Sequence, residues 1–276
     1  MKKLFDAKTL AAGLLLTSAS LGAQAAPEFT VEECFLACGG GVSREIVVDT
    51  INGNYNEVLT TTLFPGATNP FVTSGVLEYD GYSNNGSVAN FLETPAPAGY
   101  GLYALFEFSG TQFLNPVTQE VTFQANSASI QIWGDPDNDS TFTQDATGAA
   151  FPTVNPGGAD ILLLESMDLL AGAGNGRLAL NNGDFRIVLD EAALTPDGQM
   201  FFVAPDPFYL EINASGNFSD SVPALGDLSV IGVETTFAIT GAANTTFAIP
   251  EPSAIALLAS GLLSLGAVAR RRKKVA

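Results

Sequence analysis

The sequence predicts an all-β protein, folded as an antiparallel β-sandwich or jelly roll, with an N-terminal signal helix and a C-terminal transmembrane sorting helix. Three observations predict this: apolar residues alternate in short segments, turn residues separate those segments, and a charge-free apolar stretch lies near each end. Apolar residues make up 46% of the 276 residues and charged residues 14%. This composition supports a sizeable core, and we expect one large exported domain.

Alternation with a period of two marks the strands, as in 102–108, where Leu102, Ala104 and Phe106 fall on one face of an extended chain. The predicted strands cover 45–51, 56–63, 71–79, 102–108, 127–133, 185–189, 208–214 and 234–239. The predicted turns are Asn52-Gly53, Asn84-Asn85-Gly86, Pro156-Gly157-Gly158, Asn182-Gly183 and Pro196-Asp197-Gly198. Segment 159–170 fits a short helix or a buried strand, and 244–249 has the composition of a linker.

The charge is distributed unevenly along the chain. The net charge is −18, but eight of the 11 basic residues lie in the two terminal segments, which leaves Arg44, Arg177 and Arg186 between them. Because 27 of the 29 acidic residues lie there too, the exported region carries −24. Such a surface repels phosphate backbones, so we expect no nucleic-acid partner.

The chain contains no histidine, which removes the commonest general base near neutral pH and makes triad hydrolysis improbable. Its two cysteines, Cys34 and Cys38, are four residues apart. In an oxidising compartment they are candidates for a small local disulfide, and the alternative is a pair of free thiols.

The N-terminus has the three parts of a secretory signal peptide. Lys2, Lys3 and Lys8 precede an apolar stretch from Leu10 to Leu16, and small residues then lead to Ala23-Gln24-Ala25. This A-x-A pattern predicts cleavage after Ala25, and therefore export.

The C-terminus combines Pro250-Glu251-Pro252, a charge-free stretch over 254–269, and the basic cluster that begins with Arg270, Arg271 and Arg272. Sixteen residues of helix are about 24 Å long, slightly short of a hydrocarbon core of about 30 Å. The basic cluster favours a cytoplasmic end, which places the domain on the opposite side of the membrane. A permanent single-pass anchor is the alternative to a transient one.

This ordered set of features resembles the PEP-CTERM sorting signal of exopolysaccharide-producing bacteria. The resemblance implies recognition of the tail by an exosortase, a membrane protease that removes it, and thus transient insertion of the tail in the membrane.

Several segments of the exported region resemble the flocculation-associated PEP-CTERM proteins, which are needed for floc formation. The resemblance implies no catalytic residues, and residues 34–41 lie outside the matching pattern. The matching segments are 26–31, 51–57, 99–106, 132–136 and 194–205.

Asp135, Asp137 and Asp139 stand at alternate positions, a spacing typical of loops that wrap carboxylates around calcium. The match to an EF-hand is incomplete, since Ser140 replaces its glycine and Ala146 its twelfth-position glutamate. The three residues are a candidate calcium site of weak affinity. The alternative is an acidic turn with local backbone bonds.

Paired acids such as Asp190 with Glu191, or Glu32 with Glu33, are candidates for the two catalytic carboxylates of a glycosidase. Coincidental pairs are expected, however, among so many acidic residues. Trp133, Tyr100, Tyr103 and Tyr209 are candidates for stacking on sugars or, more commonly, for packing within the sheet.

Together these observations predict a signal peptide (1–25), an exported domain (26–249) and a sorting tail (250–276). We expect a non-enzymatic protein of the cell surface or extracellular matrix, without a cofactor other than calcium, that supports floc formation with exopolysaccharide. It would pass through an inner-membrane intermediate. The alternative is a secreted carbohydrate-binding module or glycoside hydrolase.

Overall fold

The computed structural model describes residues 26–37, 43–91, 99–118, 120–143, 153–156, 158–179, 182–208, 211–218 and 232–248. Strands dominate these residues. In chain order the elements are β1 (Phe29–Glu32), α2 (Cys34–Ala37), β2 (Glu45–Val48), β3 (Thr50–Thr62), β4 (Thr68–Asn84), β5 (Ser87–Phe91), β6 (Gly101–Leu114), β7 (Val121–Asp135), β8 (Thr141–Thr143), β9 (Thr153–Asn155), β10 (Ile161–Ser166), β11 (Asp168–Ala179), β12 (Asn182–Asp190), β13 (Ala193–Leu194), α3 (Pro196–Phe201), β14 (Phe202–Ala204), β15 (Glu211–Phe218) and β16 (Glu234–Ala248).

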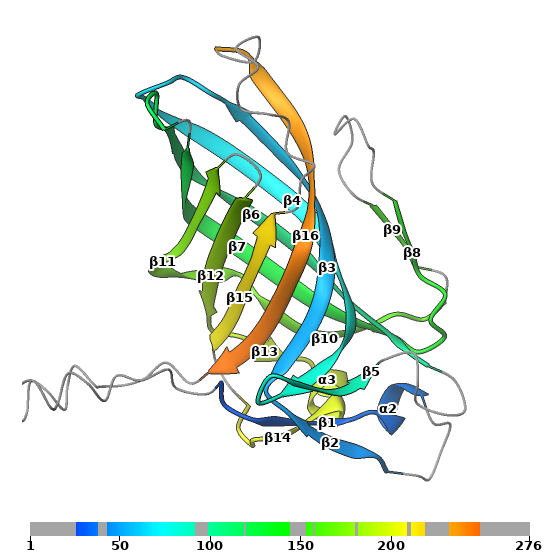
Figure 1. Ribbon diagram of the computed structural model, residues 1–276. Coiled ribbons are helices and arrows are strands. Elements are labelled where there is room, and N and C mark those ends of the chain that lie inside the picture. Colours follow the sequence, from blue (N-terminus) through cyan, green and yellow to red (C-terminus); the bar gives the residue numbers. More distant parts are fainter. Residues whose placement is uncertain are drawn as a thin grey trace, which may run out of the picture.

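One antiparallel sheet closes on itself to form an eight-stranded barrel (Figure 1). The strands follow the order β11-β12-β15-β16-β3-β4-β6-β7, and β7 then pairs with β11 to complete the ring. The short strands β10 and β13 continue from β7 beyond the ring, and β8 and β9 form a separate hairpin. The all-β, antiparallel prediction is therefore confirmed, but the chain forms a closed barrel in place of the predicted sandwich or jelly roll.

The alternating pattern could not distinguish these architectures because both bury one face of each strand. Strand length and register decide between them. β4 is 17 residues long and β16 is 15, and such long, twisted strands coil until the two edges of one sheet meet. Register shifts at Asn52/Gly53 and Ser109/Gly110 add local bending.

Three turn or linker predictions were wrong, because the segments belong to barrel strands. Asn182-Gly183 begins β12, where the two residues pair with Ala179 and Leu178 of β11. Asn52-Gly53 lies inside β3, at a register shift. A Cβ at Gly53 would lie only 2.3 Å from the Glu78 carbonyl oxygen, so glycine serves close strand approach there and not a turn. The predicted linker 244–249 is mostly strand, since β16 continues to Ala248.

The Asn85-Gly86 turn is confirmed, and both residues have the positive φ angles, 50° and 73°, that a tight hairpin needs. The predicted turn at Pro196-Asp197-Gly198 is instead the first part of α3. Thr195 caps this helix, and its side chain accepts a hydrogen bond from the Gly198 backbone N–H at 3.0 Å. In the ambiguous segment 159–170, the structure contains strand β10 and the start of β11.

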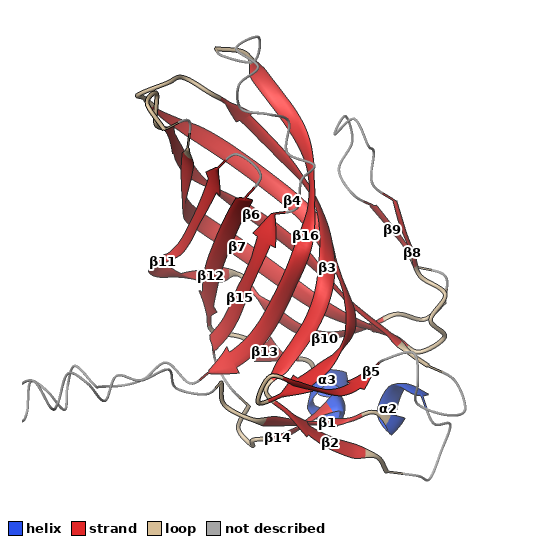
Figure 2. Cartoon of the chain, in the orientation of Figure 1, coloured by secondary structure: helices blue, strands red, loops and turns tan. Residues whose placement is uncertain are grey.

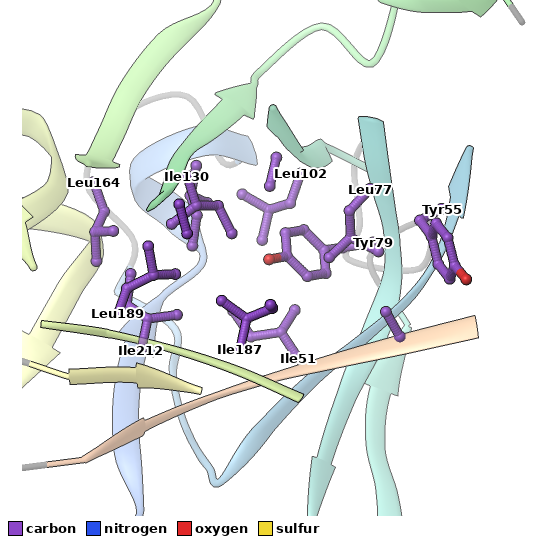
Figure 3. Packing of buried hydrophobic residues seen from close by; sticks show 14 of the residues in the cluster. Ile51, Tyr55, Leu77, Tyr79, Leu102, Ile130, Leu164, Ile187, Leu189 and Ile212 are labelled. Atoms are coloured by element: carbon purple, nitrogen blue, oxygen red, sulfur yellow. The ribbon is translucent and has the colours of Figure 1, made fainter. Parts of the chain in front are cut away.

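Inward-facing side chains from all sides fill the barrel (Figure 3). Ile51 and Tyr55 of β3 and Leu77 and Tyr79 of β4 belong to this core, and so does Ile212 of β15, which is separated from β3 by β16 alone. Each of these side chains is at least 95% buried, so the barrel interior removes them from water.

A small plug covers one end of the barrel, where the two short helices also lie (Figure 2). It contains the sheet β14-β1-β2 and helices α2 and α3. The ring of Phe29 in β1 lies 5.0 Å from that of Phe247 in β16, edge to face. Phe201 of α3 packs on Tyr100 at 6.0 Å. Aromatic contacts thus join the plug to the barrel wall.

The predicted signal peptide and the predicted transmembrane sorting helix lie outside the described residues. Within the described part of the chain, no helix is long and apolar enough to cross a membrane.

Candidate metal centre

The candidate centre begins where β7 ends, at Asp135. Its carboxylate is 2% exposed and accepts hydrogen bonds from the backbone N–H groups of Ser140, at 2.9 Å, and Asp139, at 3.3 Å. Asn138 has a φ of 50°, which turns the chain back on itself. Asp135 therefore organises the loop that follows it, as the acidic-turn alternative expected.

Pairing between strands adds a carboxylate that the spacing did not indicate. Asp160 directly precedes β10, whose first residue, Ile161, pairs with Gly134 of β7. Carboxylate oxygens of Asp135, Asp139 and Asp160 consequently lie within 4.8 Å of one another. Two oxygens that bind one calcium ion at about 2.4 Å each are at most about 4.8 Å apart, so one ion could contact all three carboxylates.

Asp160 is held from two sides. Its Oδ2 accepts hydrogen bonds from the Tyr103 hydroxyl, at 2.6 Å, and from the Ser140 hydroxyl, at 2.9 Å. Its Oδ1 is buried and has no hydrogen-bond partner among the described residues. A buried carboxylate oxygen without a donor is costly, and a bound cation would satisfy it.

Asp137, the middle residue of the predicted trio, is not part of this group. Its Oδ2 lies 2.9 Å from where a Cβ would stand on Gly158, and the Asp139 carboxylate oxygens lie 3.6 Å from the same point, but only Asp139 belongs to the group. Asp135 and Asp139 are thus brought together as predicted, with Asp160 as the third member. Sequence reasoning missed Asp160 because it lies 21 residues beyond Asp139, and only the β7–β10 pairing joins them.

A cleft of about 190 Å³ lies beside the centre and is largely polar. Glu78 and Asp80 of β4 line it together with Asp135. Burial raises the pKa of Asp80, and burial, followed by the adjacent Asp160, raises the pKa of the Tyr103 hydroxyl. The negative charge of the cleft favours a cation over an anion.

The acid pair Glu32 and Glu33 holds the plug in place. Glu33 is fully buried, forms a 3.0 Å ion pair with Arg44, and accepts a hydrogen bond from the Tyr100 hydroxyl at 3.3 Å. Glu32 accepts hydrogen bonds from the Ser43 hydroxyl and from the backbone N–H groups of Arg44 and Cys34. Burial acts to raise its pKa, but these three hydrogen bonds together lower it. Both carboxylates therefore have structural partners.

The second acid pair, Asp190 and Glu191, lies at the end of β12. Asp190 accepts a hydrogen bond from the Glu191 backbone N–H, and Glu191 has a φ of 56°. These features are typical of a turn.

The candidate stacking residues are mostly packed. Tyr100 is 0% exposed and Tyr103 is 3% exposed, and the Trp133 ring stacks on Tyr103 at 6.4 Å. Tyr209 lies outside the described residues.

Cys34 is disulfide-bonded, but Cys38 lies outside the described residues, so the Cys34–Cys38 pairing stays a prediction. The same holds for the processing residues: Ala23, Ala25, Pro250, Glu251, Pro252, Arg270, Arg271 and Arg272.

Comparison with known proteins identifies one segment of the chain. A family model described as the PEP-CTERM protein-sorting motif matches residues 248–273. The match supports a protein that is exported, sorted at the membrane and processed by an exosortase. No curated protein and no solved structure matches the chain.

Proposed function

We propose that this chain is a non-enzymatic protein of the cell surface or extracellular matrix that supports floc formation with exopolysaccharide. The observation that carries the proposal is the sorting motif at 248–273, which begins at the last residue of β16. The barrel is thus the cargo that the motif sorts. Its resemblance to the flocculation-associated PEP-CTERM proteins supports the role in cell aggregation.

The charge of the exported region supports a contact mediated by cations. Its three arginines already interact within the chain: Arg44 with Glu33, Arg177 with Asp184 and Glu120, and Arg186 with Asn213. The large excess of carboxylates remains on the same domain. Divalent cations would bridge such a polyanion to acidic polysaccharide.

Gene deletion and complementation test this function. Cells that lack the gene should settle slowly, and the wild-type gene should restore flocs. A Glu251→Ala variant should be exported but retained uncleaved, and mass spectrometry of its termini would show this. If the deleted strain flocculated normally, the matrix role would be refuted, whereas a mature wild-type protein that retained Arg270 would refute tail removal.

The alternative function, a secreted glycoside hydrolase or carbohydrate-binding module, has its own test. The purified protein would be incubated with the polysaccharide of the producing cells, and released sugars would be measured. Turnover that was lost in an Asp190→Asn or Glu191→Gln variant would establish the enzyme and overturn the non-enzymatic proposal. The structural roles of Glu32 and Glu33 favour the proposal over this alternative.

We further propose that Asp135, Asp139 and Asp160 hold the calcium ion that the function uses. At a calcium concentration ten times the dissociation constant, which we expect at roughly 10⁻⁴ to 10⁻³ M, binding adds about 1.4 kcal/mol to the free energy of unfolding. The melting temperature should therefore rise by a few degrees in millimolar calcium.

The Asp160→Asn variant should lose this rise, because it removes one charge from the group. Asp137→Asn is the matched control, since Asp137 lies in the same loop but outside the group. A rise that persisted in Asp160→Asn and disappeared in Asp137→Asn would refute this assignment of the ligands.

A further inference from the structure

The barrel encloses a cavity that is separate from the metal centre. It has a volume of about 50 Å³ and is lined by inward-facing residues of β3, β4, β6, β7, β11 and β12. Along β4 it lies near the start, at Phe71 and Thr73, whereas the plug packs near the other end of that strand, at Tyr82. The cavity therefore occupies the half of the barrel remote from the plug.

Aromatic rings form rigid walls around this space. Phe71, Phe108, Phe123 and Phe185 all line it. The rings of Phe71 and Phe123 meet edge to face at 5.4 Å, and Phe185 meets Tyr55 in the same way at 5.5 Å. Edge-to-face contacts hold the rings in fixed orientations, so the cavity is preformed.

Small residues leave the space open. Ala125 of β7 and Gly176 of β11 line the cavity on one side, and a Cβ at Gly174 would already approach the Ala125 Cβ to 2.6 Å. The neighbouring strands are thus too close for larger side chains at Gly174. A space of about 50 Å³ is several times what one water needs, so it accepts a small organic molecule.

Glu57 brings one acidic group to the apolar wall. Its side chain lines the cavity, and the residue is only 7% exposed. Burial raises its pKa to about 8, although a hydrogen bond with Thr73 acts in the opposite direction. At neutral pH the carboxyl is therefore protonated and has an O–H group to donate.

The neighbours of Glu57 remain uncharged over the same pH range. Among the described residues that line the cavity, Glu57 alone is charged or titratable. Tyr55 is the nearest titratable group on β3, and burial together with the charge of Glu57 raises its pKa further above its usual value. Any pH dependence of the cavity between pH 6 and 9.5 thus reports on Glu57.

We propose that this cavity binds a small neutral apolar molecule with one acceptor oxygen, such as a short-chain ketone or lactone, to which the Glu57 carboxyl donates a hydrogen bond. A neutral donor in an aromatic pocket suits a neutral acceptor, because an ionic ligand would lose its hydration without compensation. A ligand of about six non-hydrogen atoms binds with roughly millimolar affinity.

Saturation-transfer NMR of the exported protein recovered from the producing cells, with cyclopentanone as the probe, tests the proposal. We expect saturation transfer at pH 6 and about tenfold weaker binding at pH 9.5, where the carboxylate would face the carbonyl oxygen. Cyclopentane, which has the same ring without the oxygen, should bind without this pH dependence. Absence of saturation transfer from the wild type at pH 6 would overturn the proposal.

Three variants locate the site. Ala125→Leu fills the cavity and should abolish binding, whereas Val72→Ala, on the outer face of β4 between Phe71 and Thr73, should leave it unchanged. Glu57→Gln keeps an N–H donor and should bind equally at both pH values. Binding that survives in folded Ala125→Leu, or a Gln variant that keeps the wild-type pH dependence, would each refute the site. If Ala125→Leu fails to fold, the Gln variant still decides.

Discussion

At the scale of single residues, Glu57 shows how a barrel interior changes the chemistry of a side chain. It faces the core between Tyr55 and Leu59, at a position where the alternation of β3 expects an apolar residue. The sequence does show this exception to the pattern. It does not show the burial among aromatic rings that raises the pKa, because those rings come from four other strands.

The raised pKa of Glu57 predicts that stability falls as the pH rises. An unfolded chain loses this proton near pH 4.5, whereas the folded protein keeps it until about pH 8. The contribution of Glu57 is therefore fully present below pH 4.5 and declines up to about pH 8. With about 1.4 kcal/mol for each pKa unit, the loss is on the order of 5 kcal/mol.

The measurement is the difference in unfolding free energy between wild type and Glu57→Gln from urea titrations at pH 5 and pH 9. The difference isolates Glu57 from the many other carboxylates. We expect the free energy of unfolding of Glu57→Gln to increase relative to that of the wild type as the pH rises. A difference that is the same at both pH values would mean that Glu57 ionises alike in the folded and unfolded protein.

At the scale of elements, α3 is positioned by the close approach of one glycine to β10. A Cβ at Gly198 would stand 1.8 Å from the Leu163 carbonyl oxygen, a distance that no side chain tolerates. Thr195, the residue before α3, also binds β10, since its hydroxyl donates a hydrogen bond to the Leu162 carbonyl oxygen at 2.6 Å. Helix α3 of the plug thus lies directly against the β10 backbone.

Gly198→Ala should therefore destabilise the protein by about 1–3 kcal/mol or more, because α3 must move away from β10. Gln199→Ala is the matched control on the exposed side of the same helix and should change stability by less than about 0.5 kcal/mol. Thermal unfolding of both variants gives the comparison. Equal melting temperatures would show that α3 can shift without cost.

Local sequence signals account for much of the element assignment. Every predicted strand overlaps a strand among the described residues, although residues 209–210 of the predicted strand 208–214 lie outside them. Alternation succeeds here because it is a local property that one segment reveals. The Pro196-Asp197-Gly198 segment was read as a turn, although Thr195 followed by proline and aspartate also has the form of a capped helix start. Gly53 and Gly198, which the sequence assigned to turns, are glycines because each lies against the backbone of a neighbouring strand.

At the scale of the whole molecule, closure of the barrel and assembly of the metal centre could not be predicted from the sequence, for one shared reason. Both depend on which strands pair: β7 with β11 closes the ring, and β7 with β10 brings Asp160 to Asp135. Pairing partners far apart in the sequence leave no local pattern. The linker prediction for 244–249 was wrong for a related reason: Asn244 and Thr246 pair with β15 on the outer face, and buried Thr245 meets the distant Tyr79 hydroxyl.

The contact of Phe29 with Phe247 brings the first and last described strands together at the plugged end. Because these two strands are close together, we expect the barrel to fold when its chain order is permuted. A circular permutant that joins Ala248 to Ala26 through a short glycine-serine loop, and opens in the hairpin between Asn85 and Gly86, should fold with nearly the wild-type melting temperature. A permutant opened inside β6, between Gly110 and Thr111, should not fold, because that cut divides a strand of the closed ring.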